Sequence, residues 1–128
     1  MTIEPVSLSP ELMAATEALA VNVRQSEPLV LYHLAREALE SDSEAQSLIK
    51  RLSEAQAEVR TSQARGQVTL ANIEQLRALQ SRAQANRVIM DYARTQQMAI
   101  AYLREINHEI SQLISVDFGS LAKRPGCC

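Results

Sequence analysis

Hydrophobic positions recur along this chain at intervals of three and four residues. This spacing places apolar side chains on one face of an α-helix. Between residues 43 and 65 one stripe is predicted to be buried, and it comprises Ala45, Leu48, Ile49, Leu52, Ala55 and Val59. Proline and glycine are almost absent from the middle of the chain, so residues 29–118 contain a single strong helix breaker, Gly66. The pattern predicts an all-α fold with a long antiparallel helical hairpin.

Start and stop signals divide the first half of the chain into three helices. Ser9 is suited to cap a helix that begins at Pro10 and ends at about Arg24, and a second helix is predicted over residues 29–40. Ser41 and Glu44 have the spacing of a capping box, which predicts that the Ser41 side chain caps the third helix. That helix is expected to end near residue 65.

The second half of the chain predicts two more helices, which gives a bundle of about five. Gly66 suits the left-handed position after a helix end, Thr69 can cap the next helix, and a break is expected near Asn86. The thirty residues from Asn86 to Ser115 would form a rod of about 45 Å. A compact globule of this chain length is only about 36 Å across. We therefore expect the last helix to overhang its own domain.

An overhanging apolar helix requires a partner, which predicts a homodimer formed through helices. The candidate interface positions share the apolar stripe of the last helix, and they are Val88, Tyr92, Ile100, Leu103, Ile106 and Ile110. The same pattern divides the chain into an N-terminal arm (1–8), one helical domain (9–116) and a flexible C-terminal tail (117–128).

Composition and charge refine this picture. Hydrophobic residues make up 46% of the chain but aromatic residues only 3%, so the core must be built from aliphatic side chains and alanine. The net charge of −2 conceals a segregation, because residues 1–59 hold ten acids and four bases while residues 60–128 hold five acids and nine bases. The chain has neither a membrane span nor a leader-like N-terminus, which predicts a cytoplasmic protein.

Arginines are the main candidates for contacts with an acidic partner or RNA. Four of them lie in a stretch with few acids, namely Arg77, Arg82, Arg87 and Arg94. The guanidinium fork can bind carboxylates or phosphates. The alternative is a solvated helix face that pairs with the acidic first half of the chain. Scarce aromatic residues leave few platforms for stacking bases, which argues against direct binding of nucleic acid.

The two cysteines, Cys127 and Cys128, are the last two residues of the chain. Adjacent cysteines neither close a stabilising loop nor readily bond to each other. Four possibilities remain open: ligation of a metal or cluster, modification, crosslinking to another chain, or an inert or redox-sensitive tail. Thiolates suit zinc and iron–sulfur clusters, which commonly take four ligands, so one chain supplies half a set.

Other polar motifs give little support for catalysis. Glu105 and His108 have the spacing of one carboxylate and imidazole pair in a di-iron bundle, but a single copy per chain favours a solvated histidine. His33 is interpreted in the same way. The chain has no nucleophile with an associated base, no zinc-protease motif and no phosphate loop. The sequence therefore predicts a protein that is not an enzyme.

The order of these elements resembles the YlbF/YmcA family of small all-helical bacterial regulators. Three segments carry the resemblance, which extends over about residues 10–115: SDSEAQSLIKRL at 41–52, the turn at Gly66, and VIMDYARTQQ at 88–97 followed by LREINHEIS at 103–111. Arg87 follows Asn86 here, where a proline is often found in the family.

The resemblance implies a non-enzymatic protein that forms homo-oligomers, or hetero-oligomers with paralogues. Better known members tune RNA processing by a membrane-attached endoribonuclease, with effects on competence, sporulation and biofilm formation. It also implies an iron–sulfur cluster on C-terminal cysteines, to which only Cys127 and Cys128 can correspond here. Two thiolates are half of the usual set of four, so a second chain or a partner would have to supply the other ligands.

Overall fold

The computed structural model describes residues 7–116, in which every regular element is an α-helix. The helices are α1 (Pro10–Gln25), α2 (Glu27–Ser41), α3 (Ser43–Ala64), α4 (Leu70–Ala85) and α5 (Arg87–Ile114). The predicted all-α class with about five helices is confirmed. The predicted tail (117–128), including Cys127 and Cys128, lies outside the described residues, as does most of the predicted arm (1–8).

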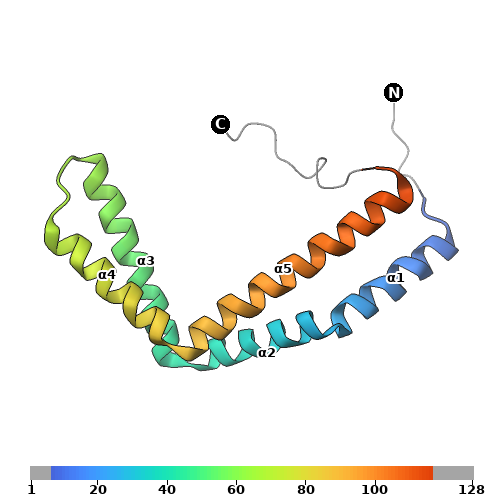
Figure 1. Ribbon diagram of the computed structural model, residues 1–128, viewed down its shortest axis with the longest axis horizontal. Coiled ribbons are helices and arrows are strands. Elements are labelled where there is room, and N and C mark those ends of the chain that lie inside the picture. The colour runs from blue at the N-terminus through green and yellow to red at the C-terminus, as the bar shows by residue number, and fades with distance from the viewer. Residues whose placement is uncertain (1–6, 117–128) are drawn as a thin grey trace.

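The helices form two arms that meet at an elbow (Figure 1). In the long arm, α5 lies along α1 and α2; in the hairpin arm, α3 packs antiparallel to α4. The expected antiparallel hairpin is thus formed by α3 and α4, and α5 turns away from it to pack on α2. The diameter of about 36 Å expected for a compact globule does not apply to this chain, because its two arms meet only at the elbow. None of the described helices is long and apolar enough to cross a membrane.

Local signals position three helix ends as expected. The Ser9 hydroxyl accepts a hydrogen bond from the backbone N–H of Leu12 at 3.2 Å, and Pro10 opens α1. The Thr69 hydroxyl accepts one from the N–H of Asn72, also at 3.2 Å. Gly66 follows the end of α3 with φ of +66°, a conformation that glycine adopts without steric cost. These predictions are confirmed.

The predicted cap of α3 is wrong by one residue. Ser41 is still part of α2, and Asp42 caps α3 by accepting a hydrogen bond from the N–H of Ala45 at 2.9 Å. The N–H of Asp42 and the side chain of Gln46 both donate to the carbonyl of Leu39. These bonds complete the last turn of α2, so Asp42 is the residue that is free to adopt the extended conformation of a cap.

The hairpin arm has a small aliphatic core. Its buried cluster comprises Leu48, Ala55, Leu79 and Ala83, with Leu52 and Leu76 packed against it. Ala45 is also buried as expected, but Ile49 is 37% exposed, so its prediction as a core residue is wrong. Leu48 already fills the position that faces α4, and Ile49 is turned by about 100° from it on the helix.

The long arm is buried only where α2 and α5 pack together. Leu39, Thr95 and Ala99 are its buried residues. The hydroxyl of Thr95 donates to the backbone carbonyls of Asp91 and Tyr92, at 2.8 and 3.1 Å, so this buried polar group is satisfied. Tyr92 packs against Tyr32 of α2 with ring centroids 5.7 Å apart. Each arm thus has its own buried residues, and Ile89 at the start of α5 packs against the cluster of the hairpin arm.

Candidate interaction surfaces

Large apolar side chains are exposed mainly on the long arm. Among the described residues, seventeen are at least 37% exposed, and only Ile49 and Leu70 belong to the hairpin arm or its turn. The other fifteen lie on the long arm or next to its ends: Leu8, Leu12, Met13, Leu19, Val21, Val30, Leu31, Leu34, Met90, Met98, Ile100, Leu103, Leu113, Ile114 and Val116. Such a concentration is typical of surfaces that bind another protein.

One lateral face of the long arm is hollowed between α2 and α5. A groove of about 270 Å³ is lined by Leu31, Leu34, Ala35, Ala38, Val88, Asp91, Arg94 and Thr95. A second hollow of about 380 Å³ adjoins it on α5, where Arg94 lies between Met90 and Met98. We call the groove and the adjoining hollow together the lateral groove. Methionine side chains adapt to different shapes, and an apolar groove between helices is typical of sites that bind a helix of another protein.

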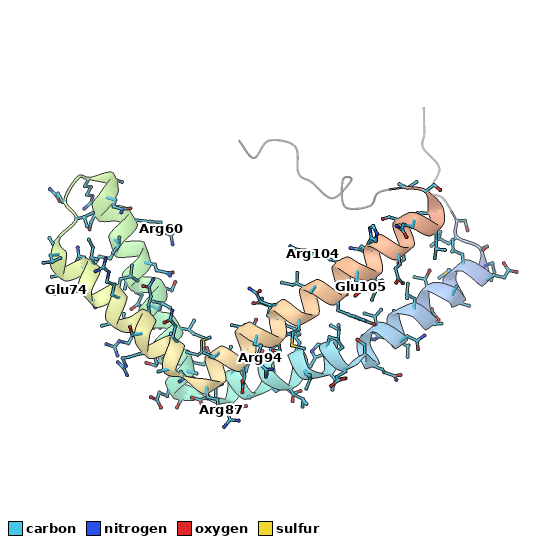
Figure 2. The ribbon with its side chains drawn as sticks, in the orientation of Figure 1. Arg60, Glu74, Arg87, Arg94, Arg104 and Glu105 are labelled. Atoms are coloured by element: carbon cyan, nitrogen blue, oxygen red, sulfur yellow. The ribbon has the colours of Figure 1, made fainter. Side chains whose placement is uncertain are left out.

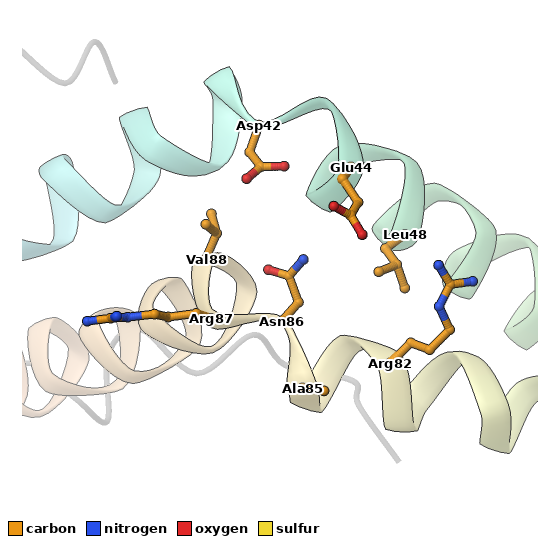
Figure 3. Close-up of a pocket in the computed structure, with 8 residues that line it drawn as sticks. All are labelled: Asp42, Glu44, Leu48, Arg82, Ala85, Asn86, Arg87 and Val88. Carbon is orange, nitrogen blue, oxygen red and sulfur yellow. The ribbon is translucent and has the colours of Figure 1, made fainter.

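A mixed-charge cleft of about 430 Å³ lies at the elbow (Figure 3). It is lined by Asp42, Glu44, Leu48, Arg82, Ala85, Asn86, Arg87 and Val88. Arg82 reaches toward α3, whereas Arg87 extends away from the cleft and its side chain is 93% exposed. The cleft therefore combines carboxylates and arginine side chains with the apolar side chains of Leu48, Ala85 and Val88.

The four predicted contact arginines do not form one patch. Arg82 and Arg87 line the elbow cleft, Arg94 lines the lateral groove, and Arg77 is exposed on α4 outside both. Arg87 lies at the elbow and Arg94 lies farther along α5 (Figure 2). The carboxylate of Asp91 is 3.9 Å from Arg87 Nε and 3.7 Å from Arg94 Nη2. Their contact with a partner or RNA stays a prediction.

The predicted interface residues of α5 divide into two groups. Ile100 and Leu103 are exposed, at 43% and 40%. The other four are half-buried, and these are Val88, Tyr92, Ile106 and Ile110. Val88 lines the lateral groove and the Tyr92 ring contacts α2, so part of the stripe already packs within the chain. Whether these positions form an oligomer interface stays a prediction.

Sequence reasoning missed the lateral groove. Leu31, Leu34 and Ala38 recur at helical spacing, and this signal was readable in the sequence. The sequence does not show which of the apolar stripes on α2 faces α5. The structure turns Leu39 and Tyr32 toward α5 and leaves Leu34 58% exposed.

Few polar groups in the described chain are electrostatically perturbed. A hydrogen bond with Tyr32, and then burial, hold the pKa of the Tyr92 phenol above its usual range. A hydrogen bond to Glu40 raises the pKa of Arg36. His108 is exposed, with Nε2 3.1 Å from the side-chain nitrogen of Gln112. Within residues 7–116, no three His, Cys, Asp or Glu side chains come together as metal ligands.

The family model for "Control of competence regulator ComK, YlbF/YmcA" matches residues 12–115. The chain belongs to the YlbF/YmcA family. The match spans all five described helices, so the resemblance noted in the sequence is confirmed. The description of the family concerns control of the competence regulator ComK.

One solved structure supports the fold of this YlbF/YmcA chain. It is described as Bacillus subtilis RicA in complex with RicF, and it is 22% identical in sequence. The alignment covers 84% of this chain and 96% of that one, with a TM-score of 0.71. Comparison with curated proteins gives no match. At this identity the likeness bears on the all-helical fold.

Proposed function

We propose that this chain is a non-enzymatic, cytoplasmic regulatory subunit that binds protein partners through its long arm. The observation that carries the proposal is the exposure of fifteen large apolar side chains on that arm and next to its ends. Burying apolar surface contributes about 25 cal/mol per Å², so a partner that covers this arm would be strongly favoured. The family description, which concerns control of the competence regulator ComK, and the complex of RicA with RicF support the same class of function.

The partner is a second copy of the chain, a paralogue or another protein, and the regulated process is RNA processing or development. Direct contact with RNA is the weaker alternative. The arginines are divided between two cavities and an open face, and Tyr32 and Tyr92 pack on each other. An RNA complex formed by the hairpin arm would weaken steeply with added salt, whereas a complex of apolar helices would not.

Affinity capture with the tagged full chain tests the proposal. A long-arm variant carries Leu12→Glu, Leu34→Glu and Met98→Glu, all at exposed positions. The matched control carries Ile49→Glu and Leu70→Glu outside that arm. Wild type and control should retain the same protein, and the long-arm variant should lose it with unchanged helicity by circular dichroism. The proposal is wrong if the control loses the partner while the long-arm variant keeps it.

A second candidate function rests on the terminal thiols. Cys127 and Cys128 from two chains would supply the four thiolates that a cluster or zinc requires. Anaerobic purification with iron and zinc quantification tests this, using deletion of residues 125–128 as the variant. A scaffold keeps its partner after the deletion, and a cluster-dependent switch loses both metal and partner. Absence of metal from the anaerobic complex would reject the candidate.

A further inference from the structure

We propose that the tip of the hairpin arm is a second docking surface, which binds an acidic segment of another protein. The tip comprises residues 59–73: the last turns of α3, the turn around Gly66 and the first turn of α4. Carboxylates of that segment would pair with Arg60 and Arg65, and one of its apolar side chains would cover Leu70. This inference goes beyond the proposed function, which concerns the long arm.

The tip lies at the end of the hairpin arm that is remote from the elbow (Figure 1). The 22 residues of α3 rise about 33 Å along the helix axis, which separates the tip from the start of the long arm. Most of the exposed large apolar side chains in the described chain lie on the long arm or next to its ends. A protein that covers those side chains can therefore leave the tip free for a different ligand.

The tip carries two arginines and no acidic residue. Between Glu58 and Glu74 the charged residues are Arg60 and Arg65, and both are exposed. Neither guanidinium takes part in the ion pairs that residues 7–116 form. Figure 2 shows Arg60 and Glu74 projecting from opposite sides of the hairpin arm. The tip is therefore locally basic in a chain whose net charge is −2.

Helical spacing distinguishes these two arginines from a basic residue nearer the elbow. Side chains three or four positions apart are neighbours on a helix. Arg51 has Glu54 at this spacing, so its own helix supplies a carboxylate nearby. Every residue three or four positions away from Arg60 or Arg65 is uncharged. An acidic ligand would supply the opposite charge that the hairpin arm does not provide at its tip.

Leu70 adds an apolar contact close to these charges in the chain. Its side chain is 69% exposed at the first position of α4. Among the large apolar residues that the structure describes, only Leu113 is more exposed. Arginine is enriched at protein–protein interfaces, where its stem packs on apolar groups while its fork binds carboxylates. A segment with several carboxylates around one apolar side chain would match both features of the tip.

Hydrogen bonds hold the turn that presents these side chains. The N–H of Gly66 donates to the carbonyl of Gln63 at 3.0 Å. The N–H of Gln67 donates to the carbonyl of Ser62 at 2.8 Å, and the Thr69 hydroxyl caps α4. A surface that is ordered before binding loses less conformational entropy when its ligand binds. The turn is thus a preorganised support for the proposed contact.

The composition of the tip favours a protein ligand over RNA. Residues 59–73 contain no aromatic side chain on which a base could stack. Contact with phosphates would also leave Leu70 exposed. A planar guanidinium can instead bind a carboxylate through two parallel hydrogen bonds, while an adjacent apolar side chain of the same segment covers the leucine.

A second copy of this chain fits the tip less well than a different protein. The acidic residues of the chain are concentrated in residues 1–59, outside the tip. Contact between the tip of one copy and that segment of another would join two different surfaces. Such head-to-tail contacts continue as open chains unless their geometry closes a ring.

NMR titration of the isotope-labelled full chain tests the inference. The probe is a short peptide of glutamates and serines around one leucine. A matched peptide carries lysine in place of each glutamate, and an oligouridine represents RNA. The glutamate peptide should shift the amide signals of residues 59–73, and added salt should weaken its binding because exposed charges are screened. The lysine peptide should leave these signals unchanged.

Two double variants locate the contact. Arg60→Gln with Arg65→Gln should raise the Kd for the glutamate peptide about tenfold, because two exposed ion pairs are lost. The matched control, Lys50→Gln with Arg51→Gln, removes the same charge from exposed positions nearer the elbow and should change the Kd by about twofold or less. Leu70→Ala should weaken binding without changing its dependence on salt.

Several results would overturn the inference. The two double variants could lose affinity equally, or the glutamate peptide could shift signals of the long arm instead of the tip. Tighter binding of the oligouridine than of the glutamate peptide would assign the tip to RNA. Tip signals that shift with protein concentration alone would assign it to self-association.

The tip and the long arm can be tested separately. Arg60→Gln with Arg65→Gln should leave capture of a protein by the long arm unchanged. Leu70→Glu should abolish binding of the glutamate peptide and also leave that capture unchanged. Peptide binding at the tip without any capture by the long arm would reject the proposed function and leave this inference standing. Capture by the long arm without peptide binding at the tip would do the reverse.

Discussion

Asp42 and Asn86 line the same cleft from the two chain connections that join the arms. Each is the single residue between two consecutive helices. Each side chain accepts a hydrogen bond from the backbone N–H three residues ahead, on Ala45 at 2.9 Å and on Ile89 at 3.1 Å. The elbow therefore consists of two equivalent helix caps placed side by side.

Loss of either cap should destabilise the protein by about 1 kcal/mol, because one backbone N–H at the helix start loses its acceptor. Asp42→Ala and Asn86→Ala are the test variants, measured by urea unfolding. Asp42→Asn and Asn86→Asp retain an acceptor oxygen and should unfold close to wild type. Equal losses for alanine and the conservative variant would contradict the capping role.

The core of the hairpin arm should be sensitive to truncation at Leu79. This residue is 4% exposed within the cluster of α3 and α4. Leu79→Ala should lower the free energy of unfolding by about 2 to 5 kcal/mol, because it removes buried methyl groups and leaves a cavity. Leu70→Ala, at a position that is 69% exposed, serves as the control and should cost about 0.5 kcal/mol or less.

Gly66 should resist substitution for reasons of backbone conformation alone. Its φ is +66°, and a Cβ added there would meet no atom within 4 Å. Gly66→Ala should therefore cost about 1 to 2 kcal/mol in urea unfolding, without any steric clash. Gly66→Asn should cost less, because asparagine tolerates this conformation. A neutral alanine variant would show that the turn relaxes to another backbone conformation.

Stability should fall at alkaline pH through Tyr92. Its pKa is raised by the hydrogen bond with Tyr32 and by burial, so folding favours the neutral phenol. This contribution is complete below the ordinary tyrosine pKa of about 10 and is lost as pH rises through the higher pKa of the folded state. A titration of tyrosinate absorbance should show a late step that Tyr92→Phe removes and Tyr102→Phe leaves in place. Tyr32→Phe should move that step to lower pH.

The sequence was sufficient to predict the helix caps and turns of this fold, but it was not sufficient to predict which helices pack against each other. Thr69 and Asn86 act on backbone groups three residues away, so short sequence motifs suffice to place them. The choice between Ser41 and Asp42 as a cap depended on Gln46, whose side chain completes the preceding helix. Such competition between neighbouring residues is not apparent from motif spacing.

Helix pairing depends on contacts that are distant in sequence. The apolar stripe runs through Asn86 with little interruption, and nothing in it indicates that α5 leaves α4 to pack on α2. The lateral groove arises from that pairing, so Leu34 and Met98 were not identified as surface residues. The arginines were expected to act together, but helix geometry distributes them among different faces.

The hairpin arm is inserted between two helices that pack on each other without it. Because α2 and α5 meet at the elbow, adding one turn to both α3 and α4 would move the Gly66 tip outward by about 5.4 Å and leave the long arm unchanged. The hairpin arm is thus a spacer of adjustable length. The length of the hairpin arm therefore sets the reach of the Gly66 tip independently of the surface of the long arm.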